Sequence, residues 1–482
     1  MHQTIHKNLI GGEWVEGPSA AENINPSDLS DVVGLYARGD ACQTEQAIEA
    51  AQAARPVWAV WTAEHRADAL DRIGTELLAR AEELGDLLSR EEGKTRPEGI
   101  GEVIRAGRIF KFFAGESLRL NGELIPPIRQ GVEVEVSREP EGVVGIITPW
   151  NFPIAIPAWK IAPALAYGNT VVFKPADLVP GSAWALAEII HRAGQLPAGA
   201  FNLVMGPGSQ VGHSLVNARQ VRAVSFTGSA DTGARIGLSC MQRGAKVQLE
   251  MGGKNPLVIL DDAHLDTAVS VAIQGSFYST GQRCTGSSRL IVQSGIYPRF
   301  IAAMKERMAA LRIDDARQPG TDIGPVASSA QFEQDLMYIH LAYEEGGQIA
   351  AGGEVLQRAT RGFYLSPALI TETDNTMRIN REEVFGPVAS VIRVRDYDEA
   401  LHVANDTAFG LSSGICTTSL RHATDFKRRS AAGMVMVNVP TAGVDYHAPF
   451  GGRKGSSHGA REQGSYAREF YTAVKTCYTA AG

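Results

Sequence analysis

The amino-acid sequence predicts an α/β protein with at least two domains. The chain has 482 residues, and single hydrophobic cores stop growing at roughly 250 to 300 residues. Short β-branched runs alternate with helical segments over residues 143–260, which is typical of parallel βαβ units. After residue 260 the alternation returns with longer connections, so we expect a second α/β domain.

The earliest strong pattern is helical. Apolar residues step by three or four over residues 61–94, which predicts one long amphipathic helix with a core-facing side. Gly93 is expected to end it. The buried face would consist of Leu70, Ile73, Leu77, Ala81, Leu84 and Leu88.

The next region supplies the first parallel sheet. Strands are predicted over residues 143–147, 170–173, 201–204, 221–226 and 247–249, with helices over 183–193 and 232–240. Later strands over 290–292 and 388–394 belong to the second domain. Because open parallel sheets bind ligands beyond the carboxyl ends of their strands, we expect a nucleotide site at that edge of the first sheet.

Composition limits the classes of partner and location. The net charge of −7 comes from interspersed acidic and basic residues, so nucleic acid is not an expected partner. No apolar run reaches about 20 residues and no signal peptide is apparent, which excludes a membrane span and favours the cytoplasm. The odd number of cysteines, without a Cys-x-x-Cys pair, indicates neither a disulfide framework nor a bound metal. They are Cys42, Cys240, Cys284, Cys416 and Cys477.

Two glycine-rich segments are candidates for a phosphate cradle. Gly206, Gly208 and Gly212 nearly match the dinucleotide fingerprint, but the last interval is one residue too long, so we interpret them as a turn. The segment 226–229, Phe-Thr-Gly-Ser, runs from a predicted strand into a helix. The free N–H groups of such a helix start can face a pyrophosphate, although an ordinary turn would have the same pattern.

Seven motifs along the chain carry a family resemblance. They are Thr-Pro-Trp-Asn-Phe-Pro at 148–153, Lys-Pro-Ala at 174–176, Phe-Thr-Gly-Ser at 226–229, Leu-Glu-Met-Gly-Gly at 249–253, Gly-Gln-Arg-Cys at 281–284, Glu-Val-Phe-Gly-Pro at 383–387 and Pro-Phe-Gly-Gly at 449–452. In order and spacing the sequence resembles the aldehyde dehydrogenase superfamily. The resemblance implies oxidation of an aldehyde to a carboxylic acid with NAD or NADP.

The resemblance assigns three catalytic residues. Cys284 matches the nucleophile, since a thiolate can form the tetrahedral adduct from which hydride leaves. The Asn151 amide and the backbone N–H of Cys284 would stabilise the oxyanion. Glu250 would activate water against the thioester, which requires a buried carboxylate with a raised pKa. The structural alternatives are an inert thiol, a helix cap and a surface carboxylate.

The same resemblance implies the cofactor contacts. Lys174 would bind the adenosine ribose, Ser229 the pyrophosphate and Glu383 the nicotinamide ribose, with Phe385 near the ring. Asp177 stands where many NAD-specific members have glutamate, so the choice between NAD and NADP stays open, with a lean to NAD. Further expected contacts are Thr148, Trp150, Phe226, Gly228 and Gly252.

For the substrate, the resemblance implies an apolar tunnel formed by Phe152, Ile156, Trp159, Val444 and Phe450. Arg105 and Arg283 would add positive charge there, and arginine binds carboxylates well, although either could be structural. The segment 444–457 resembles a subgroup that includes α-ketoglutaric semialdehyde dehydrogenases, with Ser457 at a usual glycine position. We therefore expect an acidic semialdehyde substrate, with succinic semialdehyde as the nearest competitor.

The resemblance also implies an architecture. Residues 1–120 and 139–252 would form a Rossmann-like NAD(P)-binding domain, 253–467 the catalytic domain, and 121–138 with 468–482 a small β flap. The alternation of residues 132–136 predicts a strand with one polar face, which would join subunits into a homodimer or homotetramer. A CoA-acylating dehydrogenase and a catalytically silent homologue are the alternatives to an acid-forming enzyme.

Overall fold

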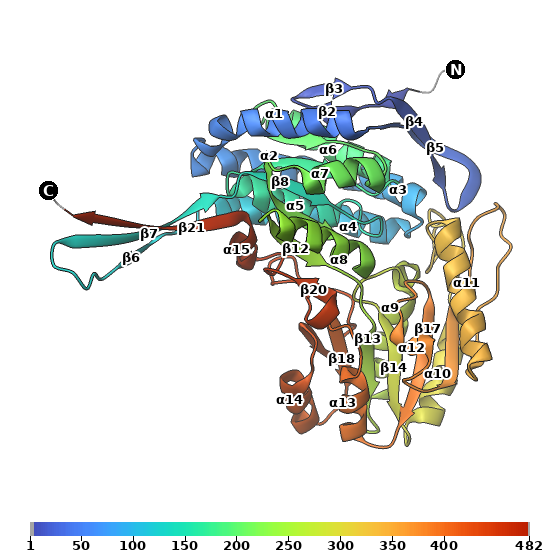
Figure 1. Cartoon of the computed structure of the whole chain (residues 1–482). Helices are drawn as coiled ribbons and strands as arrows, with labels where there is room; N and C mark the ends of the chain where they lie inside the picture. The colour runs from blue at the N-terminus through green and yellow to red at the C-terminus, as the bar shows by residue number, and fades with distance from the viewer. Residues whose placement is uncertain (1–3, 481–482) are drawn as a thin grey trace.

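The computed structural model describes residues 4–480. It consists of two α/β bodies and a β arm that projects from their side (Figure 1). The upper body contains an eight-stranded sheet and the lower body a seven-stranded sheet. None of the helices in this range combines the length and hydropathy needed to cross a membrane.

The upper sheet is mainly parallel and Rossmann-like, and it contains all five strands predicted for this region. Its strands, from one edge to the other, are β20 (Ser457–His458), β12 (Lys246–Glu250), β11 (Val221–Thr227), β8 (Val143–Ile147), β9 (Thr170–Lys174), β10 (Phe201–Leu203), β2 (Asn8–Ile10) and β3 (Glu13–Val15). The strands from β12 to β10 run parallel, whereas β20 and β2 are antiparallel to their neighbours.

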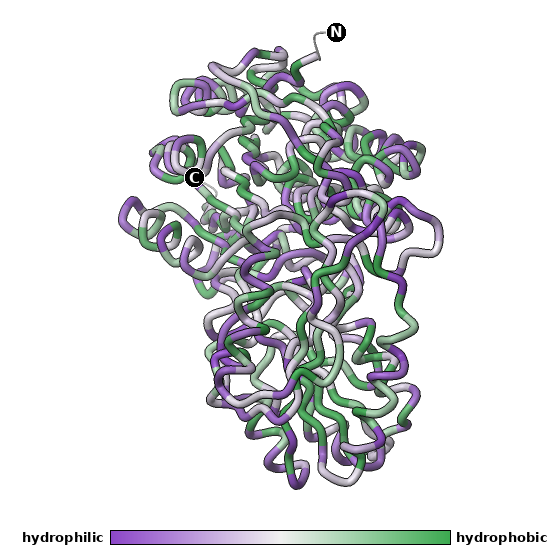
Figure 2. Tube along the Cα trace, turned by 90° about the vertical axis from the view of Figure 1, so that its right-hand side faces the viewer, coloured by the Kyte–Doolittle hydropathy of each residue, from purple (hydrophilic) through white to green (hydrophobic). Residues whose placement is uncertain are grey.

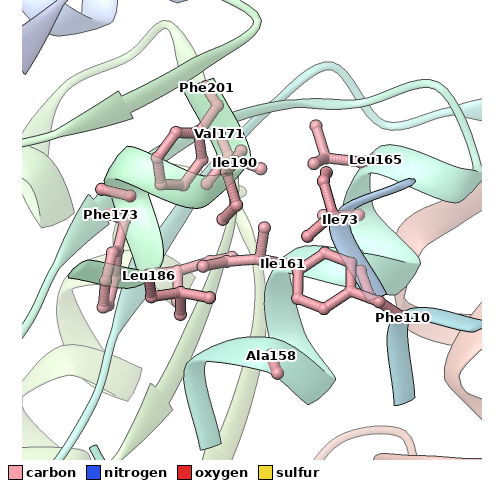
Figure 3. Close-up of a cluster of buried hydrophobic side chains, with 14 of the residues drawn as sticks. Ile73, Phe110, Ala158, Ile161, Leu165, Val171, Phe173, Leu186, Ile190 and Phe201 are labelled. Carbon is pink, nitrogen blue, oxygen red and sulfur yellow. The ribbon is translucent and has the colours of Figure 1, made fainter. Parts of the chain in front are cut away.

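Helices cover both faces of this sheet. One face carries α1 (Ala41–Ala59), α7 (His213–Asn217) and α8 (Ala230–Gln242); the other carries α5 (Ala155–Ala166) and α6 (Pro180–Gly194), with α2 (Ala63–Ala79), α3 (Ala81–Glu92) and α4 (Arg96–Ser117) behind them. Val143 and Val144 pack into opposite cores because successive strand residues face opposite ways. Figure 3 shows part of the second core, where Phe173 and Leu186 meet helix α5.

The long helix predicted over residues 61–94 is wrong in one respect, since two helices occupy this region. Helix α2 ends and α3 begins at Arg80, whose φ of −102° and ψ of 18° leave the helical range. The Arg80 guanidinium pairs with Glu83 and with Glu188 of α6, so contacts with another helix hold the bend. The predicted apolar face is nevertheless buried throughout, and Gly93 ends α3 with a φ of 90°.

The lower sheet forms the second α/β body. Its strands are β15 (Gln348–Ala351), β16 (Ala368–Thr373), β17 (Val388–Val394), β14 (Ser287–Gln293), β13 (Asn255–Ile259), β18 (Ser412–Cys416) and β19 (Met434–Val437). Its helices are α9 (Leu265–Phe277), α10 (Tyr297–Ala309), α11 (Ser329–Glu344), α12 (Arg378–Arg381), α13 (Tyr397–Asn405) and α14 (Leu420–Arg429). Hydrophobic residues concentrate along its central strands, with hydrophilic residues toward the periphery (Figure 2).

Two small sheets complete the fold. One joins β1 (Ile5–His6), β5 (Asp28–Arg38) and β4 (Ser19–Asn25); the other is the arm of β21 (Thr472–Ala480), β7 (Val132–Pro140) and β6 (Glu123–Ile125). Helix α15 (Arg468–Tyr471) precedes β21, so the strand of the C-terminal flap segment starts four residues into that segment. Residues 481–482 of the predicted flap lie outside the described residues.

Strand β20 brings a late part of the chain back to the upper sheet. Ser457 and His458 pair with Glu250 and Leu249 of β12, although they come after the whole lower sheet in sequence. This return lies at the junction of the two bodies (Figure 1) and places the segment around Ser457 against the end of β12.

Candidate active site

A cavity of about 740 Å³ lies beyond the carboxyl ends of the upper strands. This is the edge at which parallel α/β sheets bind nucleotides. Of the predicted cofactor contacts, six line it: Trp150, Gly228, Ser229, Gly252, Glu383 and Phe385. Cys284 and Asn151 also line it, so the predicted nucleophile borders the predicted cofactor site.

Several groups around this cavity suit a dinucleotide. Ser229 precedes helix α8 and makes no side-chain bond to the helix backbone, so the first N–H groups of that helix stay free for phosphate oxygens. A Cβ on Gly228 would lie 2.5 Å from the Phe226 ring, which explains Phe226 as packing beneath the turn. The Thr148 hydroxyl is buried and lacks a hydrogen-bond partner within the described residues.

Glu383 and Phe385 face the same cavity from the lower body. The Gly253 N–H donates to Glu383 Oε1 at 2.9 Å, and burial raises the pKa of Glu383 to about 7. A Cβ on Gly252 would lie 2.1 Å from a Glu383 oxygen, so glycine is required for this approach. Phe385 packs edge-on against Trp150, with ring centroids 5.5 Å apart.

Lys174 and Asp177 form a separate polar group at the carboxyl end of strand β9. Lys174 Nζ donates to Asp177 Oδ1 at 3.3 Å and to Pro175 O at 2.7 Å. Asp177 borders a hollow of about 330 Å³, and the Arg38 guanidinium from β5 lies 3.6 Å from its Oδ2. Sequence patterns missed Arg38, since β5 belongs to a different sheet.

Cys284 lies in the loop between helix α9 and strand β14. The chain before it has positive φ at Ser279, Thr280 and Gly281, and a Cβ on Gly281 would lie 2.1 Å from Gly386 O. Burial, Glu250 and Glu383 raise the pKa of the Cys284 thiol to about 12. The thiol therefore needs a proton acceptor as it attacks.

Asn151 is held by hydrogen bonds of its side chain and of its backbone carbonyl. Its Nδ2 donates to Gln282 O at 2.9 Å, and its backbone carbonyl accepts from Lys94 Nζ at 2.8 Å. An amide nitrogen carries two hydrogens, so one N–H of Asn151 stays free of this bond, in a residue that lines the same cavity as Cys284. The helix-cap alternative finds no support, because helix α5 begins at Ala155 and has Ile154 as its cap.

Glu250 is the last residue of β12 and is only 2% exposed. The Ser457 hydroxyl donates to its Oε2 at 2.6 Å. Burial and the nearby carboxylate of Glu462 raise the pKa of Glu250 well above its usual range. Lys160 and Arg461 oppose this shift. A carboxylate with a raised pKa has the basicity that water activation needs.

A second cavity, of about 810 Å³, lies on the other side of Cys284. All six predicted substrate residues line it: Arg105, Phe152, Trp159, Arg283, Val444 and Phe450. Ile156, also expected in the tunnel, lines the first cavity instead. Phe152 precedes helix α5 whereas Ile156 lies in its first turn, so the two side chains reach opposite sides of Cys284.

The two arginines of the second cavity differ in their partners. Arg283 Nη2 donates to Glu98 Oε1 at 3.0 Å and to Ser279 Oγ at 2.8 Å. Arg105 donates to neutral acceptors, Val444 O at 2.5 Å and Gln463 Oε1 at 3.1 Å. Within residues 4–480 Arg105 forms no ion pair, so its positive charge is not neutralised by direct contact with a carboxylate.

Comparison with known proteins agrees with this geometry. The model of the aldehyde dehydrogenase family matches residues 14–477. The chain belongs to the aldehyde dehydrogenase family. It is thus an oxidoreductase that acts on aldehydes with NAD or NADP as the acceptor, as the sequence motifs predicted.

Three relatives illustrate the range of the family. The chain is 43% identical to the α-ketoglutaric semialdehyde dehydrogenase of Bacillus subtilis, over 99% of this chain and 98% of the relative. It is 36% identical to the mitochondrial succinate-semialdehyde dehydrogenase of Arabidopsis thaliana, over 97% and 88%. The crystal structure of a Staphylococcus aureus betaine aldehyde dehydrogenase with NAD⁺ superimposes with a TM-score of 0.96 and 34% identity, over 99% and 95%.

Several residues around this aldehyde dehydrogenase site are not evident from sequence patterns. Glu102 receives the N–H groups of Ile154 and Ala155 and pairs with Lys94 at 2.7 Å. Glu462 is 2% exposed and receives the Trp159 indole N–H at 2.6 Å. Buried carboxylates are uncommon and look the same as surface carboxylates in a sequence, so neither Glu102 nor Glu462 could be recognised from the sequence.

Proposed function

We propose that the chain oxidises a small acidic semialdehyde, such as α-ketoglutaric semialdehyde, to the carboxylic acid. The observation that carries this proposal is the unpaired Arg105 guanidinium in the cavity beside Cys284. Two hydrogen bonds leave each η nitrogen with a second N–H, enough to bind a distal carboxylate. The name of the Bacillus relative supports the same substrate class.

Succinic semialdehyde is the second candidate substrate. It carries the same distal carboxylate, and one relative is named for it. The presence of Glu250 in a buried setting argues against a CoA-acylating enzyme, since a base that activates water would compete with coenzyme A for the thioester.

In the proposed first half-reaction, Cys284 Sγ attacks the aldehyde carbon, and the thiol proton passes to solvent water in the cavity as the C–S bond forms. The free N–H of the Asn151 amide and the backbone N–H of Cys284 stabilise the resulting oxyanion. Removing one such donor typically costs roughly a hundredfold to a thousandfold in rate. A bound nicotinamide dinucleotide supplies the hydride acceptor when the oxyanion collapses to a thioester.

In the second half-reaction, Glu250 removes a proton from water as the water attacks the thioester carbon, and Cys284 leaves as the thiol or thiolate. The apolar walls of the substrate cavity, including the Trp159 and Phe450 rings, which pack in a tilted arrangement with centroids 5.5 Å apart, limit the access of water to the adduct. This division of labour between Cys284 and Glu250 yields the free acid.

For the dinucleotide we assign the ribose hydroxyls of the adenosine to Lys174 and Asp177, the pyrophosphate to Ser229 at the start of α8, and the nicotinamide ribose to Glu383. Either NAD or NADP suits the family. Arg38 beside Asp177 partly offsets the negative charge that would repel a 2′-phosphate.

Assembly and location are further parts of the proposal. The arm leaves large apolar side chains exposed, among them Leu124 at 73% and Val474 at 59%, which supports subunit pairing through this sheet into a homodimer or homotetramer. The five free thiols suit the cytoplasm. We also propose a division into domains at residues 120, 138, 252 and 467, which the separate sheets support, although β20 pairs with the cofactor-side sheet and β7 extends to Pro140.

The test is production of NADH and NADPH with α-ketoglutaric semialdehyde, succinic semialdehyde, a neutral alkyl aldehyde and an aromatic aldehyde, each with and without coenzyme A. The proposal predicts the highest kcat/KM for the two acidic semialdehydes, without any need for coenzyme A. A preference for the neutral or aromatic aldehyde would contradict the assigned substrate class, and dependence on coenzyme A would contradict acid formation.

A further inference from the structure

The contact between Ser457 and Glu250 is the most specific feature of the site that the proposed reaction leaves unused. The two residues face each other in the antiparallel pair of β20 and β12. Ser457 Oγ donates to Glu250 Oε2 at 2.6 Å and accepts from the Gly452 N–H at 2.6 Å. The hydroxyl is therefore fixed in direction, with its single hydrogen committed to the carboxylate.

This contact places the Glu250 carboxylate away from the reacting space. Cys284 lines both cavities, whereas Glu250 lines neither. The other carboxylate oxygen packs over the backbone of Gly451, where a Cβ would lie 2.8 Å from Oε1. The carboxylate thus lies over the turn formed by Gly451 and Gly452, behind the space where aldehyde and hydride acceptor would meet.

We propose that Ser457 is a positioning residue, whose hydrogen bond holds the Glu250 carboxylate withdrawn until the thioester forms and so times its action as the base for hydrolysis. This inference rests on the proposed role of Glu250. The geometry supports it in two ways. A carboxylate in the reacting space would repel the developing oxyanion, and a buried carboxylate without a donor tends to take up a proton.

The groups facing Glu250 explain why one hydroxyl matters here. Glu462, from the segment after β20, raises the pKa of Glu250, while Lys160 of helix α5 and Arg461 lower it. Lys160 is already paired with Glu462, so its charge is largely neutralised, and Arg461 bonds to the Gly452 carbonyl rather than to Glu250. The Ser457 hydrogen bond also lowers the pKa of Glu250. Among the described residues, Ser457 is the side chain that donates a hydrogen bond to this carboxylate.

The experiment measures decay of the acyl-enzyme directly. Enzyme, excess NAD and α-ketoglutaric semialdehyde are mixed, quenched at intervals, and the thioester on Cys284 is followed by intact-protein mass spectrometry between pH 5.5 and 9. For Ser457→Ala we expect the acidic limb of the decay rate to move up by about one pH unit, with the plateau at high pH kept. The rate of acyl-enzyme formation should fall, because a released Glu250 carboxylate can approach the developing oxyanion.

Two variants make the result specific. Ser457→Thr keeps the hydroxyl and should restore the wild-type limb. Ser456→Ala removes a neighbouring buried hydroxyl whose bonds go only to backbone groups, Gly252 O and Gly410 N, and should leave the limb in place. An unmoved limb in Ser457→Ala, or an equal loss of rate at every pH, would overturn the inference.

Glu250→Gln separates this inference from the proposed function on which it rests. If the thioester still hydrolyses at the wild-type rate in Glu250→Gln, the role of Glu250 as base is wrong, and the inference about Ser457 falls with it. If hydrolysis is lost in Glu250→Gln while Ser457→Ala keeps the wild-type limb, the base is right and the positioning role alone is wrong.

Discussion

Replacing Arg105 with alanine should remove the enzyme's preference for acidic over neutral aldehydes. The guanidinium already donates to Val444 O and Gln463 Oε1, which leaves for the substrate one N–H on each η nitrogen and the Nε–H, which makes no hydrogen bond within the described residues. Hydrogen bonds to a charged group contribute about 1.5 to 3 kcal/mol. At about 1.4 kcal/mol per decade, Arg105→Ala should lower kcat/KM for α-ketoglutaric semialdehyde by roughly tenfold to 150-fold.

A neutral aldehyde of similar length serves as the internal reference. It has no carboxylate to lose, so its kcat/KM should fall only through the lost contacts of Arg105 with Val444 and Gln463. Arg105→Lys should give an intermediate value, because an ammonium group cannot form the paired hydrogen bonds of a guanidinium. Arg108→Ala, an exposed arginine on the same helix, is the matched control and should change neither substrate.

The assay is initial-rate formation of NADH or NADPH for both aldehydes, with the ratio of their kcat/KM values as the readout. An equal fall for the acidic and the neutral aldehyde would show that Arg105 is structural. In that case the Arg105 guanidinium would no longer support the assignment of an acidic substrate.

Three further predictions concern charges around the same cavities. Arg283→Ala should change the ratio of acidic to neutral aldehyde kcat/KM by no more than about fivefold, because a carboxylate already holds this guanidinium; a larger change would make it a substrate ligand. Arg38→Ala should weaken the binding of NADP relative to NAD by about twofold to fivefold, whereas Asp177→Asn should strengthen it. Unchanged ratios of the two Kd values in both variants would place the 2′-hydroxyl elsewhere. Glu383→Gln removes a negative charge that raises the pKa of Cys284, so the thiolate is favoured and alkylation by iodoacetamide should speed up at every pH from 7 to 10; a slower reaction would refute this sign.

The sequence determined the class of fold and most of the chemistry. Strand runs such as residues 143–147 and 388–394 coincide with β8 and β17, because alternating or fully apolar runs are local signals. The motifs around Asn151, Glu250 and Cys284 identified the family, since each requires particular residues over a few adjacent positions. The break at Arg80 was missed because one of its partners, Glu188, lies on helix α6, far along the chain.

Tertiary structure decided which charges are free and which are engaged. Arg105 and Arg283 look alike in the sequence, yet only the fold brings Glu98 to Arg283 and leaves Arg105 with neutral acceptors. Ser457 is 207 residues from Glu250 and meets it only because β20 returns to the upper sheet. Pairing and burial depend on contacts distant in the chain, and these long-range contacts set the pKa values and free donors on which the reaction depends.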